Sequence, residues 1–463
     1  MPLEKTSKPN KMAVMPMGRL VFSLSLPIMI SMLVQALYNV VDSLYVSHIA
    51  DTPAVLHASD KAVQALTLAF PIQMLMTAVS VGTGVGVSAI LSRYLGQKNR
   101  SGASRVAGNA VFLAGLYYLA FLIFGLVGAA PFVAGQTTDP VTAGFATSYL
   151  KICTTASFGS MFYFAYEKVL QATGKSTLAM LVQMSGAIAN IILDPFFIYG
   201  WWGLPELGVT GAAIATVLGQ CLSLVIGIFV HYRYNDLVDH ELHYLRPDFA
   251  IIRKIYAIGL PAIVMSAMTS VMSYGMNMLL GAVSASLVTA FGIYFKLQNF
   301  IYMPAFGLNN ALVPIAGFSY GAKSKERLKA ALRWGLLFVS IIMGSGILLL
   351  QGLAAPIASL FAVSAETLSV TVQALKIISF GYLFAGANII LQGFCQALGN
   401  GVYSLLISLL RMALLLLPLV WLLIKTGHTS LVWIAFPLAE AVSLLFAVYV
   451  TRKLARKRFK EIA

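Results

Sequence analysis

Apolar runs, each long enough to cross a lipid bilayer, follow one another along almost the whole chain. A helix needs about 20 apolar residues to span the hydrocarbon core. With 59% hydrophobic and only 10% charged residues, the 463-residue chain lacks the charged surface of a water-soluble globule. We therefore predict an all-α polytopic membrane protein with twelve transmembrane helices and no room for a soluble catalytic domain. The runs cover roughly residues 20–48, 62–92, 106–130, 143–171, 178–200, 209–231, 255–281, 287–316, 334–354, 368–397, 403–424 and 430–451.

Lysine and arginine gather in alternate loops, and this bias predicts the orientation. Basic residues cluster before the first run, between runs 2 and 3, 6 and 7, and 8 and 9, and in the closing "TRKLARKRFK". Positive charge stays on the cytoplasmic side, so both termini should be cytoplasmic in a multi-pass protein of the cell membrane. The net charge of +15 then reflects this bias and attraction to anionic lipid, not binding of nucleic acid. No cleaved targeting segment is indicated.

Motifs for metal or enzyme chemistry do not emerge from the sequence. Cys153, Cys221 and Cys395 lie inside predicted helices without CxxC spacing, so neither disulfides nor a zinc site is indicated. The glycine-rich "GTGVG" at 82–86 has no preceding strand, and close helix packing explains it better than a nucleotide loop. Without HExxH or GxSxG, an enzyme is not expected, and no cofactor is expected either.

The chain contains an internal repeat. The segment 149–175 resembles 374–400, and "FPIQ" at 70–73 resembles "FKLQ" at 295–298. We therefore expect two six-helix halves in the same orientation, with a substrate path between them. The predicted parts are an N-terminal cytoplasmic tail (1–18), a first lobe (19–231), a cytoplasmic loop (232–250), a second lobe (251–451) and a basic cytoplasmic tail (452–463).

One carboxylate lies within the first apolar run. Asp42 shares a helical face with Gln35 and Tyr38, at i, i+3 and i+7. An ionised aspartate inside a membrane costs about 2.5–3.5 kcal/mol on insertion scales, so a functional partner is expected. The repeat has the apolar Met276 where the first half has Asp42. The alternative is that Asp42 is hydrated near the membrane surface.

A second acid follows in "NIILDP", where Asn190 and Asp194 occupy i and i+4 of one helical face. Because Pro195 comes next, ordinary turn chemistry at a helix end is the competing explanation. From the residues alone, function and turn chemistry remain equally good explanations.

Three segments together resemble the multidrug and toxic compound extrusion (MATE) family, in its DinF-like branch with MepA-like proteins. They are "LPIMISMLVQALYNVVDSLYVSHI", "NIILDPFFIYG" with "GVTGAAIAT", and "MPAFGLNNALVPIAGFSYGAKSKERL". The resemblance spans nearly all twelve predicted helices. It implies two lobes in a V shape and an exporter driven by a proton or sodium gradient.

The resemblance also implies a site. In the DinF-like branch, matching positions of helices 1, 5 and 6 form a cation site, which implies Asp42, Asn190, Asp194 and Thr216, with Thr210 as a competitor for the last. Two carboxylates in a low-dielectric lobe cannot both ionise without a bound cation, so a proton or sodium ion could occupy the site. Pro27 also matches the family and offers a hinge, or only a packing irregularity.

A promiscuous pocket would suit repackable thioethers and aromatic rings. The expected substrate-binding residues are Gln35, Tyr38, Asp42, Phe158, Met161 and Met184. The last three could equally be ordinary core.

The chain departs from the NorM-like branch of the family, which places acids in helices 7 and 10. Here helix 7 has none and helix 10 has only Glu366 at its outer mouth, so coupling is expected in the first lobe alone. Ion pairing between helices is the expected role for most of the remaining mid-span charges. These charges are Glu167, Lys168, Lys296, Arg411 and Glu440.

The resulting hypothesis is a secondary active exporter of amphipathic, often cationic, organic compounds that works by ion antiport and alternating access. Its expected partners are small organic drugs or dyes and membrane lipids, and the expected state is a monomer. The alternative is a flippase for lipid-linked precursors. That reading usually needs several basic residues in the central cavity and extra helices, and neither is evident here.

Overall fold

The computed structural model describes residues 10–51, 57–361, 364–427 and 429–462, and every regular element in these ranges is helical. Each predicted apolar run is one helix or one interrupted helix, so the predicted all-α fold is confirmed. In the first half, the short α1 (Lys11–Val14) precedes α2 (Met17–Val46), α3 (Ala58–Gly96), α4 (Arg100–Ile123), η1 (Phe124–Gly128), α5 (Ala129–Ala134), α6 (Pro140–Thr155), α7 (Phe158–Ala172), α8 (Ser176–Tyr199), η2 (Trp201–Gly203) and α9 (Val209–Tyr234).

After the linker helix η3 (Leu242–Leu245), the second half repeats this order. It contains α10 (Phe249–Gly281), α11 (Ala285–Gly321), α12 (Lys325–Ser359), α13 (Ala365–Ser379), α14 (Tyr382–Ala397), α15 (Gly401–Leu409), η4 (Leu410–Leu415), α16 (Leu416–Lys425), η5 (Thr429–Ile434) and α17 (Ala435–Ile462). Among the described residues, nine helices are long and apolar enough to cross a membrane, or ten if α13 and α14, bent by 50°, form one span.

Local backbone features confirm the duplication. The fourth span of each half is interrupted near its middle, between α6 and α7 and between α13 and α14. Lys98 and Lys323, in the matching turns "GQKN" and "GAKS", both adopt positive φ, at 59° and 56°. The next residue in each turn, Asn99 or Ser324, caps the following helix through its side-chain oxygen. The two halves therefore have the same turn, a lysine with positive φ followed by a helix-capping residue, at equivalent positions.

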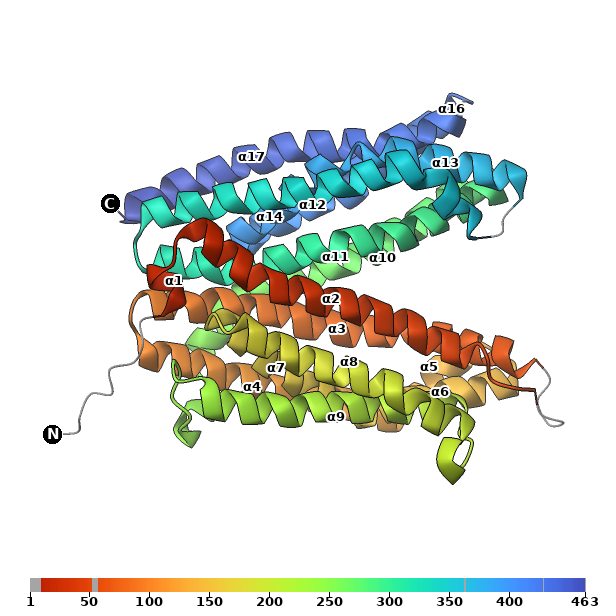
Figure 1. The fold of residues 1–463 in the computed structure, drawn as a ribbon, viewed down its shortest axis with the longest axis horizontal. Helices are drawn as coiled ribbons and strands as arrows, with labels where there is room; N and C mark the ends of the chain where they lie inside the picture. Colours follow the sequence, from red (N-terminus) through yellow and green to blue (C-terminus); the bar gives the residue numbers. More distant parts are fainter. Residues whose placement is uncertain (1–9, 52–56, 362–363, 428, 463) are drawn as a thin grey trace.

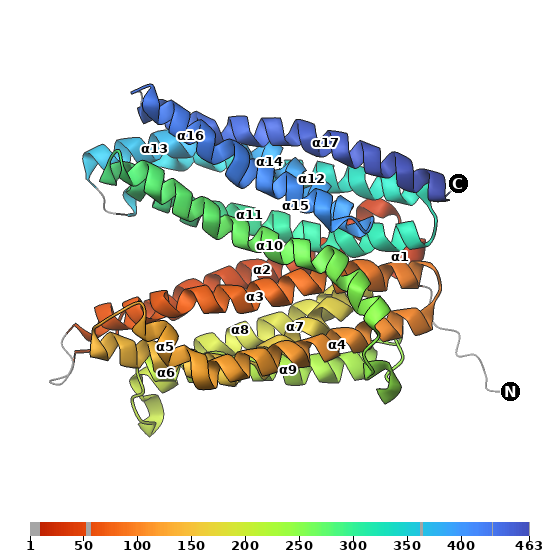
Figure 2. The ribbon, with the colours of Figure 1, turned by 180° about the vertical axis from the view of Figure 1, so that it is seen from behind.

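The two halves form two bundles, α2–α9 and α10–α17, which diverge from a shared end (Figures 1 and 2). That end holds α1 and the C-terminal end of α17 (Figure 1). The bundles meet where α3 packs on α10 and α11, and where α2 packs on α11. Gly86 lies against the carbonyl of Ile255, and Gly96 against that of Phe318, so an added Cβ would overlap backbone at both. Close helix packing through small residues, as predicted for 82–86, is confirmed.

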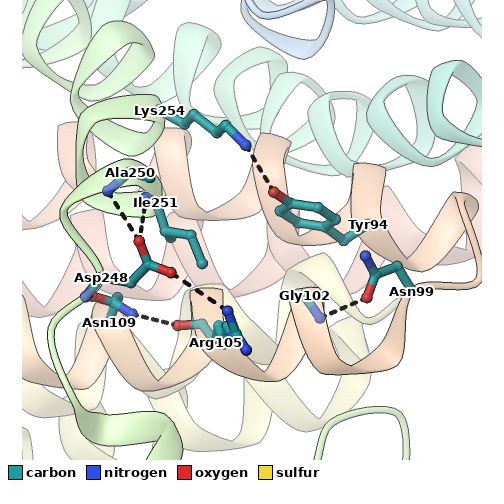
Figure 3. A network of polar contacts seen from close by, with 9 residues as sticks. All are labelled: Tyr94, Asn99, Gly102, Arg105, Asn109, Asp248, Ala250, Ile251 and Lys254. Carbon is teal, nitrogen blue, oxygen red and sulfur yellow. Dashed lines mark hydrogen bonds and ion pairs between the residues drawn. The ribbon is translucent and has the colours of Figure 1, made fainter.

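A polar network ties the linker to the first bundle (Figure 3). The Asp248 carboxylate caps α10 by accepting the N–H groups of Ala250 and Ile251 at 3.0 and 3.3 Å, and it lies 3.8 Å from the Arg105 guanidinium. The backbone N–H of Asp248 donates to Asn109 Oδ1 at 2.9 Å. The start of the second bundle is thereby fixed to α4.

Candidate ion-binding site in the first bundle

The site lies where α2, α8 and α9 pack together inside the first bundle. Gly186 of α8 and Gly219 of α9 face each other, because a Cβ on either would come within 2.7 Å of the other's carbonyl oxygen. This close approach allows short polar side chains on the two helices to meet. Glycine at both positions is therefore a geometric requirement of the site.

Asn190 connects the polar side chains of α8 and α9. Its Nδ2 donates to Asp194 Oδ1 at 3.2 Å and to Thr216 Oγ1 at 3.3 Å. Asp194 is 0% exposed, Asn190 2% and Thr216 8%. Of the two threonines considered from the sequence, Thr216 is the one that joins this cluster.

Asp42 reaches the same region from α2. It is 9% exposed, and its carboxylate lies within electrostatic range of Asp194. Three buried oxygen atoms around the cluster have no hydrogen-bond partner among the residues that the structure describes: Asp42 Oδ1, Asp194 Oδ2 and Asn190 Oδ1. Within the described chain, neither acid forms an ion pair. Buried acceptor oxygens that lack donors are suited to bind a proton or a hard cation, which would supply the missing partner.

A pocket of about 30 Å³ adjoins the cluster. This volume suits one or two waters or a small ion, and it is far below the roughly 300–1,000 Å³ of a drug-binding pocket. Gln183 donates to Gln35 across it. Its lining includes Gln35, Tyr38, Tyr163, Gln183, Gly186, Asn190, Thr216 and Gln220. Gln35 and Tyr38 therefore face the ion cluster.

The structure does not gather the other predicted substrate residues at this pocket. Phe158 is 39% exposed and packs edge-to-face against Tyr118 of α4. Met161 is buried, accepts a hydrogen bond from Ser80 at 3.3 Å and lines a different pocket. Met184 is partly buried on α8 outside both pockets. Pro27, the predicted hinge, lies inside an uninterrupted α2.

Gln183 and Gln220 belong to the pocket but were not predicted from the sequence. A signal for both was present. Gln183 stands seven residues before Asn190 on α8, and Gln220 four residues after Thr216 on α9, so each extends a polar helical face already recognised. A neutral amide within an apolar run is a weaker sign of function than an ionisable acid.

Among the remaining mid-span charges, Arg411 and Glu440 form the predicted ion pair between helices, whereas Lys168 and Glu167 pair within a single helix, α7. Arg411 and Glu440 are 2.5 Å apart, and Lys168 and Glu167 are 4.0 Å apart, with Gln171 hydrogen-bonded to both of the latter. Lys296 departs from this pattern. It is exposed on α11 and forms no ion pair within the described residues.

Comparison with known proteins connects this arrangement to a family. The family model described as MatE matches residues 27–196 and 261–422, one segment in each bundle. The probable multidrug resistance protein YoeA of Bacillus subtilis is 27% identical over 391 residues, covering 83% of this chain and 84% of its own. The multidrug export protein MepA of Staphylococcus saprophyticus is 23% identical over 430 residues, covering 92% and 91%.

Solved structures share the whole architecture. A multidrug resistance MATE family transporter of the MOP superfamily, solved in an outward-facing conformation, aligns with a TM-score of 0.89 at 25% identity. The alignment covers 99% of this chain and 100% of that one. A MATE protein in a straight conformation aligns with a TM-score of 0.90 at 23% identity, covering 98% and 100%.

Proposed function

Because this chain belongs to the MatE family, we propose that it is a secondary active exporter of amphipathic, cationic organic compounds, driven by exchange for protons or sodium ions. The observation that carries the proposal is the group of three partnerless buried oxygens on Asp42, Asp194 and Asn190. Buried acceptors of this kind are stabilised when a proton or cation joins them. Homologous proteins named for multidrug resistance and export support the substrate class.

In the proposed cycle, the ion and the drug alternate. An ion entering the pocket neutralises the acids and draws α2, α8 and α9 together. Its release leaves two like charges in a low-dielectric site, which favours a different packing of these helices. The drug and the ion would each bind more tightly to a different one of two conformations of the bundles, and this difference couples their transport.

We also propose that the protein lies in the cell membrane as a monomer with both termini in the cytoplasm. Basic residues in alternate loops support this orientation. The end at which the bundles diverge would then face outward, as in the outward-facing relative (Figure 2).

The test is transport by purified protein in liposomes. A panel of cationic dyes is loaded while proton and sodium gradients are imposed separately. We expect at least one gradient to drive dye movement by the wild type but not by Asp194→Asn. Asp236→Asn is the matched control, because this exposed linker acid lies outside the site. If neither gradient moves any dye, the proposal is wrong, and movement of lipid-linked sugars instead would favour a flippase.

A further inference from the structure

A buried ion pair in the second bundle takes no part in the proposed ion exchange. Arg411, in η4, is 5% exposed and donates Nε and Nη2 to Glu440 Oε1 at 2.9 and 2.5 Å. Asn388 of α14 donates Nδ2 to Glu440 Oε2 at 2.8 Å. Three helical elements of the second bundle thus converge on one carboxylate.

The internal repeat shows which residues of the first bundle correspond to this network. In α7 and α14, the repeated segments 149–175 and 374–400 match Tyr163 with Asn388. In α8 and α15, buried positions follow in the same order: Ser176, Ala179, Val182, Gln183 and Gly186 match Gly401, Ser404, Ile407, Ser408 and Arg411. Arg411 therefore stands where the first bundle has Gly186.

A shared hydrogen bond aligns the last helices of the two bundles. Ser223 Oγ of α9 donates to the carbonyl of Val182 at 2.7 Å, and Ser443 Oγ of α17 donates to that of Ile407, the counterpart of Val182, at 3.4 Å. Three residues before each serine stand Gln220 and Glu440. Glu440 is therefore the counterpart of Gln220.

These three correspondences describe one place in the fold. Tyr163, Gly186 and Gln220 all line the small pocket beside the ion cluster. Their counterparts, Asn388, Arg411 and Glu440, are hydrogen-bonded into one network. Beyond the extra residue of the π-helix η4, Asn190 and Asp194 correspond to the buried Leu416 and Val420. The second bundle therefore has an ion pair where the first has a pocket.

We propose that the Arg411 guanidinium is a built-in cation. It occupies, in the second bundle, the space that the pocket has in the first, and it neutralises Glu440 permanently. Arginine does not lose its proton in proteins, and it binds one carboxylate through several N–H donors. This lobe is consequently closed to exchangeable cations, and removal of the arginine side chain opens a cation site beside Glu440. The proposal extends the proposed function by confining ion exchange to the first bundle.

The test measures binding and requires no transport, so it remains valid even if the dye experiment fails. Guanidinium, the group that Arg411→Ala removes, is the probe. Detergent-purified wild type, R411A and R411A/E440Q are titrated with millimolar radiolabelled guanidinium. We expect R411A to bind one guanidinium per chain more than the wild type. The double variant should lose this extra binding, because the carboxylate is gone.

Thermal unfolding gives a second readout. Guanidinium should raise the midpoint temperature of R411A towards that of the wild type, whereas tetramethylammonium, which has the same charge but no N–H donors, should not. The proposal would be overturned if R411A bound no more guanidinium than the wild type, or if R411A/E440Q bound as much as R411A. R411A could be too unstable to purify, because it leaves the Glu440 carboxylate without a partner. In that case R411A/E440Q, which lacks this carboxylate, should be recovered in higher yield. Equal yields would contradict the proposal.

Discussion

At the scale of single residues, Asp42 and Asp194 combine burial with missing partners. Within the described part of the chain, each has a carboxylate oxygen that accepts no hydrogen bond, and the two acids lie within electrostatic range of each other. An isolated buried charge is costly, and two together are costlier. These features support the proposal that the two residues form one ion-binding unit.

If Asp42 and Asp194 act as one unit, the effects of substituting them on transport should not add. Asp42→Asn preserves shape but fixes the neutral state, so folded protein should still insert while gradient-driven dye transport falls to background. The double variant Asp42→Asn with Asp194→Asn should be little worse than either single variant, because members of a coupled site do not act independently. Initial transport rates at matched protein incorporation check this. Wild-type transport and wild-type ion dependence in Asp42→Asn would exclude the proposed role.

A surface acid predicts a pH effect with a defined sign. Lys175 Nζ lies 2.5 Å from Asp236 Oδ1, and this hydrogen bond holds the pKa of Asp236 below its usual value of 3.8. A lowered pKa stabilises the folded state above about pH 4, and the stabilisation disappears as the pH falls through the lowered value. Asp236 is largely exposed, so Asp236→Asn should cost less than about 1 kcal/mol at pH 7. The difference in thermal stability should be smaller at pH 3 than at pH 7, and a difference that grows in acid would contradict the assignment.

At the scale of elements, the start of α10 depends on one side chain. Asp248 caps the helix, pairs with Arg105 and is fixed through its N–H by Asn109 (Figure 3). Asp248→Ala should lower stability by about 0.5–2 kcal/mol, because two helix N–H groups lose their acceptor. Asp248→Asn keeps an oxygen for the cap and should cost less. Thermal unfolding of the two variants tests this, and equal losses would assign the effect to the ion pair.

Helix contacts also explain where the bundles stay together. Glycines of α3 and α11 allow backbone-to-backbone approach between the bundles, as at Gly96 against Phe318 and Gly321 against Arg93. The Tyr117 hydroxyl of α4 is hydrogen-bonded to that of Tyr256 of α10 in the same interface. The proposed alternating-access cycle would have to separate these contacts, so we expect the elements that carry them to form the closed end.

At the scale of the whole molecule, the duplicated bundles share one fold but differ in their interior chemistry. The first has a pocket beside two acids, whereas the second has an arginine paired with a glutamate. If ions are exchanged as proposed, this difference would confine the exchange to the first bundle, while its copy keeps a constant charge. In the proposed mechanism, this asymmetry, rather than the repeat itself, matches coupling through a single ion site.

The orientation of the whole chain gives a topological prediction. Both ends of the protein should be cytoplasmic because basic residues flank them. A C-terminal epitope tag should therefore bind antibody only after cells are permeabilised, whereas an extracellular-loop tag in 135–139 serves as the accessible control. Labelling of the C-terminal tag on intact cells would reverse the proposed orientation.

The membrane class, the helical fold and the duplication follow from the amino-acid sequence alone. Each depends on local information: apolar length, the loop residues that cap helices, and repeated segments. The sequence also marked Asp42, Asn190 and Asp194, because polar groups are rare enough within apolar runs to be noticed.

The contacts that these polar groups make, by contrast, depend on how the helices pack. Thr216 rather than Thr210 joins the cluster, and Gln183 and Gln220 line its pocket, because Gly186 and Gly219 set the spacing of α8 and α9. Helical periodicity gives each residue a face but not the distance to the neighbouring helix. The pairing of Arg411 with Glu440 likewise depends on how two neighbouring spans pack, 29 residues apart in the chain, and no helical periodicity encodes that contact.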